Sequence, residues 1–241
     1  MSRFFRRLFL VSSVCVGLIL LGVTLFLPPA AAWMCPACYG FERIAPTVYL
    51  ERDAPDAETA RILDMIDAAQ ARVQTALGPL QVDPEILICH SPQCDTRMDG
   101  QGAWARAFGA VFILVGPPGR NVEILSHELA HIAIHRRIGP WAQMQNALPA
   151  WFDEGLAVIL SRDMRYLTET EDGTLGCLMS SDGDLPVLAR DWRRRAGEEF
   201  ATLYPMAACE VLDWLERHGG MGAVGPALAA VRGGAPFPAT Q

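Results

Sequence analysis

The sequence predicts an α+β protein with an N-terminal transmembrane helix, followed by one domain with a small sheet and a C-terminal helical part. Residues 8–27 form an uncharged, mostly apolar run. Short apolar runs between residues 47 and 115 have strand character, and from residue 121 onward the apolar residues recur at helical spacing. About 200 residues follow the apolar run, enough for one compact domain, which we place at residues 33–232.

The N-terminal segment has the charge and length typical of a membrane anchor. Residues 1–7 contain three Arg, and the next Arg is Arg43. A run of about 20 apolar residues can span a bilayer, and the Arg excess holds the N-terminus in the cytoplasm. We therefore predict a single-pass protein of the inner (cytoplasmic) membrane whose domain faces the periplasm or the cell exterior. Residues 30–32 (Ala-Ala-Ala) also fit a cleavage site, so a cleaved, secreted form stays open.

Four segments form the first half of the predicted domain. Strands are expected at Thr47–Leu50, Glu85–Cys89 and Phe108–Val115, because each is short and apolar and is bounded by turn residues. Residues 57–77 have the pattern of a long amphipathic helix that ends at Gly78-Pro79.

The next predicted helix is of the buried type and begins at Asn121, a favourable N-cap residue. Gly139-Pro140 is a typical helix stop, and Arg136 and Arg137 in the last turn suit the helix dipole. A wide surface of this helix is apolar: Val122, Ile124, Leu125, Leu129, Ile132, Ala133 and Ile134.

This helix carries the sequence His127-Glu128-Leu129-Ala130-His131. Residues four apart lie on one helix face, so His127 and His131 can bind one cation. Catalytic zinc typically has three protein ligands and an open fourth position, and it lowers the pKa of water from about 16 to near 7. Glu128 lies beside the first ligand and is the candidate general base, which later protonates the leaving amine.

A third ligand is predicted at Glu154, in Trp151-Phe152-Asp153-Glu154-Gly155-Leu156-Ala157. Leu148-Pro149-Ala150 opens another helical pattern, and Glu154 is a carboxylate in an otherwise apolar setting. Buried charges are normally paired or bound to metal, so Glu154 is a candidate Zn²⁺ ligand. The alternative is an ion pair with an Arg.

The two motifs together resemble the gluzincin metallopeptidases, the superfamily of thermolysin and aminopeptidase N, over residues 105–220. WFDEGLA is more similar to the aminopeptidase-N-like branch and its small bacterial relatives. The resemblance implies a zincin-like domain in which His127, His131 and Glu154 bind Zn²⁺ and Glu128 is catalytic. The chain has no GxMEN-type motif, so aminopeptidase activity is not implied, and its ligand spacing is slightly longer than in the large aminopeptidases.

The resemblance also bears on substrate binding and on the oxyanion. It implies that residues 109–114 form a sheet edge that pairs with an extended substrate, with a plain core strand as the alternative. Relatives often carry a Tyr at a place comparable to Tyr204, near the start of a helical pattern that runs to Gly219, so Tyr204 is the candidate oxyanion donor. Tyr166 is its rival, and a Tyr that is simply packed is the other alternative.

His135 continues the row of His127 and His131 by one more turn. Three side chains along about 12 Å of straight helix cannot reach one ion. The metzincin pattern would require Gly at position 134 and His at position 137, where Ile134 and Arg137 stand. We therefore expect His135 to support the ligands or to be structural.

Six cysteines lie outside the apolar run, and Cys15 lies within it. An even number agrees with an oxidising compartment, and spacing suggests the pairs Cys35–Cys38, Cys89–Cys94 and Cys177–Cys209 among many connectivities. The Cys35-Pro-Ala-Cys38 motif also invites a thiol-redox interpretation. A structural clip is favoured because the motif follows the apolar run directly, without the strand of a thioredoxin-like context.

Two segments lack a clear pattern. Residues 162–199 are polar and not clearly helical, and we expect a loop, tied by Cys177, that restricts access to the zinc. Residues 233–241 are expected to form a flexible tail.

Charge narrows the function. Residues 33–241 hold 17 Arg and 27 Asp or Glu, a net charge of −10, which argues against nucleic-acid binding. The leading hypothesis is a membrane-tethered zinc metallopeptidase that acts on a peptide or protein substrate. The alternatives are a zinc hydrolase of a non-peptide amide, a zincin-like assembly or binding protein without activity, which the intact Glu128 disfavours, and a thiol-redox protein.

Overall fold

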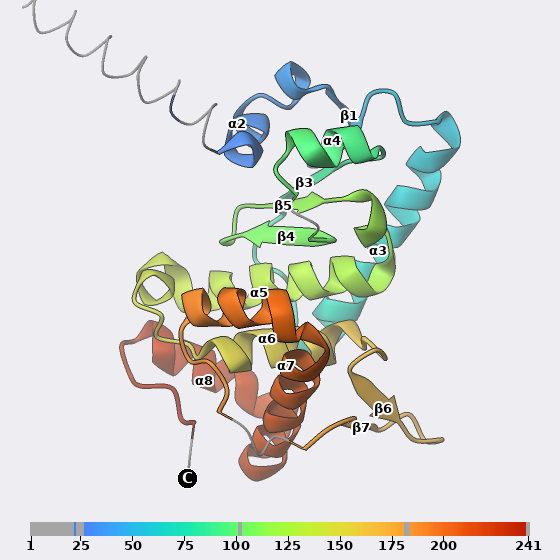
Figure 1. The fold of residues 1–241 in the computed structure, drawn as a ribbon. Helices are drawn as coiled ribbons and strands as arrows, with labels where there is room; N and C mark the ends of the chain where they lie inside the picture. The colour runs from blue at the N-terminus through green and yellow to red at the C-terminus, as the bar shows by residue number, and fades with distance from the viewer. Residues whose placement is uncertain (1–21, 23–26, 101–102, 181–183, 240–241) are drawn as a thin grey trace, which may run out of the picture.

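The computed structural model describes residues 22, 27–100, 103–180 and 184–239. Within this part the chain is α+β, as predicted, with seven α-helices, a five-stranded sheet and a two-stranded sheet (Figure 1). The strands are β1 (Phe41–Ala45), β2 (Val48–Glu51), β3 (Glu85–Ile88), β4 (Ala105–Phe108), β5 (Phe112–Val115), β6 (Leu167–Glu169) and β7 (Leu175–Cys177). The α-helices are α2 (Pro28–Met34), α3 (Asp56–Leu77), α4 (Pro92–Arg97), α5 (Val122–Met144), α6 (Ala150–Ser161), α7 (Ala189–His218) and α8 (Val224–Arg232). Short 3-10 helices are η1 (Pro36–Tyr39), η2 (Pro117–Gly119) and η3 (Met221–Ala223).

The prediction of an N-terminal transmembrane helix is corrected. Among the residues that the structure describes, no helix combines the length and the apolar character needed to cross a bilayer. The apolar helix α2 has seven residues and is about 10 Å long, against about 30 Å of hydrocarbon. The long helices α3, α5 and α7 are interrupted by charged residues. The predicted location in the inner membrane rested on that helix and is withdrawn with it.

Part of that prediction falls on residues that are not described. Of residues 1–27 the structure describes only Gly22 and Leu27. The basic segment 1–7, the run 8–27 as a whole and Cys15 therefore lie outside the described residues.

The main sheet is buried on both faces, which explains why its central strands are continuously apolar. Ile86 and Ile113 face a core shared with α3 and α5, whereas the alternating residues Leu87 and Phe112 face a second core covered by α2 and α4. Figure 1 shows the sheet between these two sets of helices, with α6, α7 and α8 stacked beyond α5.

One predicted strand is a hairpin. The segment 108–115 divides into the end of β4 and all of β5, with a turn at Gly109, whose φ of +59° favours glycine. The strand order is β1-β2-β3-β5-β4, so β5 lies inside the sheet and the edge strands are β1 and β4. The predicted substrate edge at 109–114 is therefore wrong, because these residues are the turn and an interior strand. The alternative, a core strand, is confirmed for β5, and the edge on this side of the sheet is Ala105–Phe108.

The α5 helix begins and bends where the sequence predicts. The Asn121 side chain accepts a hydrogen bond from Ile124 N at 2.9 Å, an N-cap interaction. Gly139, with φ of +80° and ψ of 163°, interrupts the helix, which resumes at Pro140 in a new direction. Arg137 donates to the carbonyl oxygens of Leu77 and Pro79, so its main contact is the end of α3.

The segment 162–199 is less irregular than predicted. The β6–β7 hairpin occupies its first half, and α7 begins at Ala189, so residues 189–198 are helical rather than loop, with a kink of α7 at Glu199. The buried Trp192 anchors this first part of α7, and Arg195 and Glu199 form an ion pair at helical spacing.

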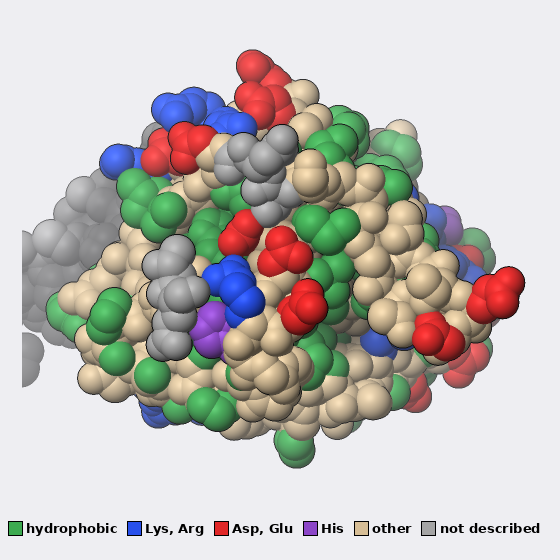
Figure 2. All heavy atoms as spheres, turned by 90° about the horizontal axis from the view of Figure 1, so that it is seen from below, with side chains coloured by type: hydrophobic (Ala, Val, Ile, Leu, Met, Phe, Trp, Pro, Cys, Tyr) green, Lys and Arg blue, Asp and Glu red, His purple; other side chains and the backbone are tan. Residues whose placement is uncertain are grey.

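On the face beyond α7 and α8, Arg side chains are interspersed with Asp and Glu (Figure 2).

Covalent and aromatic contacts hold the C-terminal part together. The three suggested disulfides are formed, and Cys177–Cys209 ties the hairpin to α7. Residues 237–239 of the predicted flexible tail pack on the domain, whereas residues 233–236 are exposed. Phe237 contacts the rings of Trp151, Phe152 and Trp214. The Trp214 Nε1–H donates to the carbonyl oxygen of Pro238 at 2.8 Å.

Candidate metal centre

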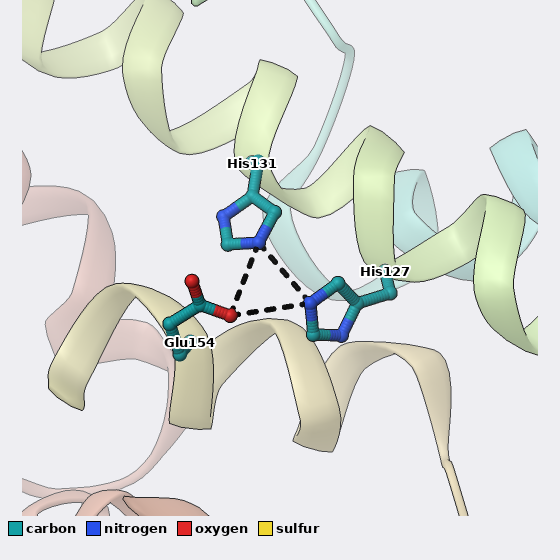
Figure 3. A group of neighbouring side chains, drawn as sticks. All are labelled: His127, His131 and Glu154. Carbon is teal, nitrogen blue, oxygen red and sulfur yellow. Dashed lines mark hydrogen bonds and ion pairs between the residues drawn. The ribbon is translucent and has the colours of Figure 1, made fainter. Parts of the chain in front are cut away.

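His127 and His131 on α5 and Glu154 on α6 point toward one another (Figure 3). The two His Nε2 atoms are 3.1 Å apart, and Glu154 Oε2 lies 3.4 Å from His127 Nε2 and 3.6 Å from His131 Nε2. The structure therefore brings together all three residues that the sequence singles out as ligands.

The size of this triangle fits a zinc ion. Zinc binds His nitrogen and carboxylate oxygen at about 2.0–2.1 Å in a tetrahedron, so two ligand atoms should be about 3.3 Å apart. The three observed separations, 3.1, 3.4 and 3.6 Å, bracket this value. The donors are two imidazoles and one carboxylate, a set that would suit a catalytic zinc with one position left open.

Backbone contacts at the start and in the middle of α6 fix this helix, and with it the position of Glu154. Pro186 O and Val187 O accept hydrogen bonds from Trp151 N and Ala150 N, and so satisfy the first amides of α6. A Cβ on Gly155 would lie 2.3 Å from Ala207 O, so only glycine lets α6 lie this close to α7.

Electrostatics keep the carboxylate of Glu154 ionised. Burial raises its pKa, but the neighbouring His131 and His127 outweigh burial and lower the pKa to about 2. Burial likewise lowers the pKa of His131, and the carboxylates of Asp153 and Glu154 raise it well above its usual value. The site thus concentrates negative charge around two imidazoles, as a divalent cation requires.

Glu128 is held beside the ligands by the edge strand. Its side chain is only 8% exposed, and Oε2 accepts a hydrogen bond from Ala107 N at 2.6 Å. Alternate residues of an edge strand turn their backbone groups away from the neighbouring strand, and Ala107 N–H points outward in this way. The Glu128 carboxylate therefore contacts the edge strand β4, while the adjacent residue His127 faces the candidate metal position.

Asp153 is a site residue that the sequence did not single out. Its Oδ1 lies 3.0 Å from His131 Nδ1, and its Oδ2 lies 2.8 Å from His135 Nε2. His135 Nδ1 in turn lies 3.2 Å from the carbonyl oxygen of Gly109 in the β4–β5 turn. His135 thus supports the ligands through Asp153, as expected from its position one turn beyond them. The only signal for Asp153 in the sequence is its place next to Glu154.

His131, His135 and Asp153 also lie close enough to one another to hold an ion. His131 is common to both groups: its Nε2 faces His127 and Glu154, while its Nδ1 faces Asp153. Burial raises the pKa of Asp153, but His135 and His131 outweigh it and hold the pKa well below its usual range. A carboxylate that receives the second ring N–H of a ligating His fixes the tautomer and orientation of that His. Asp153 has the position beside His131 Nδ1 that such a carboxylate takes.

The two candidate oxyanion donors lie together at the site. The Tyr204 ring is 6.0 Å from the His127 ring, and Tyr166 stacks on Tyr204 at 5.2 Å. The nearby Glu154 carboxylate and burial raise the pKa of Tyr204 well above its usual value. Tyr204 therefore keeps its proton and can donate it in a hydrogen bond, and its ring lies edge-on to the ring of the candidate ligand His127.

No known protein family, curated protein or solved structure matches this chain.

Proposed function

We propose that the protein is a zinc-dependent metallopeptidase that hydrolyses peptide bonds. The observation that supports this most strongly is the triangle of His127, His131 and Glu154, whose size suits zinc, with Glu128 beside it. The resemblance of the two motifs to the gluzincins agrees with the same function. The intact Glu128 argues against a binding protein that has lost its activity.

Each residue has a role that follows from its position. Zinc would supply a Lewis acid that makes water acidic enough to react at neutral pH. Glu128 accepts the proton of the attacking water and returns it to the leaving amine. Ala107 N–H orients Glu128, and Tyr204 O–H donates to the oxyanion that develops on the peptide carbonyl. The outward main-chain groups of β4 other than Ala107 N–H, which is bonded to Glu128, can pair with an extended peptide through hydrogen bonds.

Removal and return of the metal tests this function. The purified full chain, loaded with zinc, should cleave members of a quenched-fluorescence peptide library, because its site holds three ligands and a base. A chelator should abolish cleavage, and added zinc should restore it, with zinc content measured on the same samples. Zinc-loaded, folded protein that cleaves none of the peptides would contradict the proposal.

Replacing each Tyr with Phe should separate the two oxyanion candidates. Tyr204→Phe should lower kcat by about 100-fold with little change in KM, because the hydroxyl acts only as charge develops. Tyr166→Phe is the matched control, since it removes the same atom from the ring stacked on Tyr204. A kcat for Tyr204→Phe equal to that of the wild type would exclude the oxyanion role, and a selective loss in Tyr166→Phe would assign the role to Tyr166.

A further inference from the structure

The indole of Trp192, in the first part of α7, is a buried polar group without a partner. Its side chain is 2% exposed, and its Nε1–H makes no hydrogen bond within the part of the chain that the structure describes. Trp214, which is also fully buried, donates to the carbonyl oxygen of Pro238 instead. A buried donor without an acceptor is costly, so the position of the Trp192 N–H calls for an explanation.

A kink in α7 brings Trp192 to Tyr204. The two residues are 12 positions apart in the sequence, so a straight helix would separate them by about 18 Å along its axis. The helix is interrupted at Glu199, whose φ of −114° and ψ of 18° are not helical. The two rings therefore meet edge-on, with their centroids 5.3 Å apart and their planes at 87°. The kink places the unpartnered donor beside the candidate oxyanion donor.

The electrostatics of Tyr204 indicate that the Trp192 N–H reaches toward its hydroxyl. The Glu154 carboxylate and burial raise the pKa of Tyr204, and the Glu128 carboxylate adds to this effect. The Trp192 N–H acts in the opposite direction, because a donor near the phenol oxygen favours its charged form. Catalytic hydrogen bonds are often long in a free enzyme and tighten when the substrate binds. A donor close to Tyr204 but not yet bonded to it fits this behaviour.

A bond from Trp192 would decide where the Tyr204 proton points. A hydroxyl has one proton to donate and two lone pairs with which it accepts. The ring of Tyr204 is already held in place, because Tyr166 stacks on it and His127 lies edge-on to it. Once the oxygen accepts from Trp192, the proton of the hydroxyl is left for another acceptor.

We propose that Trp192 is a positioning residue for peptide cleavage, whose indole N–H donates to Tyr204 Oη when the substrate is bound and so directs the Tyr204 proton at the oxyanion. The inference rests on the proposed peptidase function and on the oxyanion role of Tyr204. Trp192→Phe keeps an aromatic ring and removes the N–H. It should lower kcat by about 5–10-fold, the contribution of one neutral hydrogen bond, with little change in KM.

A double-mutant cycle distinguishes positioning from a purely structural role. If Trp192 acts through the Tyr204 hydroxyl, Trp192→Phe should change kcat by less than ~2-fold in a Tyr204→Phe background, because the hydroxyl is already absent. If Trp192 only supports the fold, its replacement should lower kcat by the same factor in both backgrounds. Additive effects would therefore overturn the inference, as would a wild-type kcat in Trp192→Phe alone.

Trp214→Phe is the matched control. It removes the same atoms from another buried indole of α7, whose N–H bonds to Pro238 rather than to a residue of the site. Thermal unfolding of the control and of Trp192→Phe measures what the smaller ring costs in stability. Trp214→Phe should lower Tm and keep the wild-type kcat, so a loss of kcat in Trp192→Phe would not be explained by a smaller ring in the core.

A second measurement does not require Trp192→Phe to fold. The zinc-loaded full chain, isotope-labelled at the tryptophan nitrogens, is mixed with a phosphonate analogue of a peptide that it cleaves. The Trp192 indole N–H resonance should move downfield as its hydrogen bond to Tyr204 forms, and this shift should be lost in Tyr204→Phe. A resonance that stays in place, or that moves equally in Tyr204→Phe, would overturn the inference.

The outcomes separate this inference from the proposed function. If cleavage depends on Glu128 and the effects of Trp192→Phe and Tyr204→Phe are additive, the positioning role is wrong and the peptidase stands. If Tyr204→Phe itself keeps the wild-type kcat, the oxyanion role and the positioning role fail together, again without the peptidase. If no peptide is cleaved in a Glu128-dependent way, the proposed function fails and the positioning role fails with it.

Discussion

Glu128→Gln is expected to lower kcat by about 10²–10⁴-fold while zinc binding and folding stay unchanged. Gln has the same shape as Glu, and its side-chain carbonyl can still accept the hydrogen bond from Ala107 N that holds Glu128. The amide cannot accept a proton from water at neutral pH, so only the chemical step should be affected. Kinetics on a peptide that the wild type cleaves, with zinc content measured in parallel, provide the check.

The matched control is Glu216→Gln, at an exposed position on α7, which removes the same charge away from the site. It should retain wild-type kcat. If Glu128→Gln kept its activity within ~10-fold of the wild type, proton transfer by Glu128 would contribute less than general bases normally do. The role of base would then belong to another residue.

The sequence predicts the ligands on α5 because they depend on local geometry alone. Two His four residues apart share a helix face wherever that helix lies. Glu154 required a second argument, a carboxylate in an apolar helix, since its distance to His131 depends on how α5 packs on α6. Asp153 was missed for the same reason. From the sequence, the carboxylate of the adjacent Glu154 could contact the His side chains equally well. The contacts of Asp153 with Nδ1 of His131 and Nε2 of His135 depend on how α5 packs on α6.

The fold shows the same division between local and long-range information. The buried strand β3 and the helix α3 follow from their own apolar patterns. The predicted strand 108–115 covers the turn at Gly109 and all of β5 but only the last residue of β4, because Gly109 is the main sign of a turn within an otherwise apolar run. The start of α7 was missed because its first turns carry one large buried residue, Trp192, among charged ones. The packing of Phe237 depends on aromatic residues from α6 and α7, which no pattern in the tail reveals.

Glu154→Ala should weaken zinc binding by well over ~100-fold, because supporting residues already change metal affinity by 10–100-fold and Glu154 would be a direct ligand. Asp153→Asn should weaken it by about 10–100-fold, since the amide still fits but orients His131 less firmly. Competition with a chromophoric chelator measures both affinities. Asp191→Asn, at a partly exposed position in the first turn of α7, is the control and should match the wild type in zinc affinity.

The same measurement decides between the two His-containing groups that can hold an ion, because His131 belongs to both. If zinc binds His127, His131 and Glu154, then His127→Ala should be as damaging as Glu154→Ala, and His135→Ala should have only the smaller effect of a supporting residue. If His135→Ala and Asp153→Asn proved the more damaging pair, the ion would lie on the Nδ1 side of His131. Glu128 follows His127 directly on α5, so in that case it would lie beside His127 and Glu154 rather than beside the group that binds the ion. If the wild type and Glu154→Ala bound zinc with equal affinity, Glu154 would be only an ion-pair partner of the two imidazoles. The three-ligand zinc site would then be wrong.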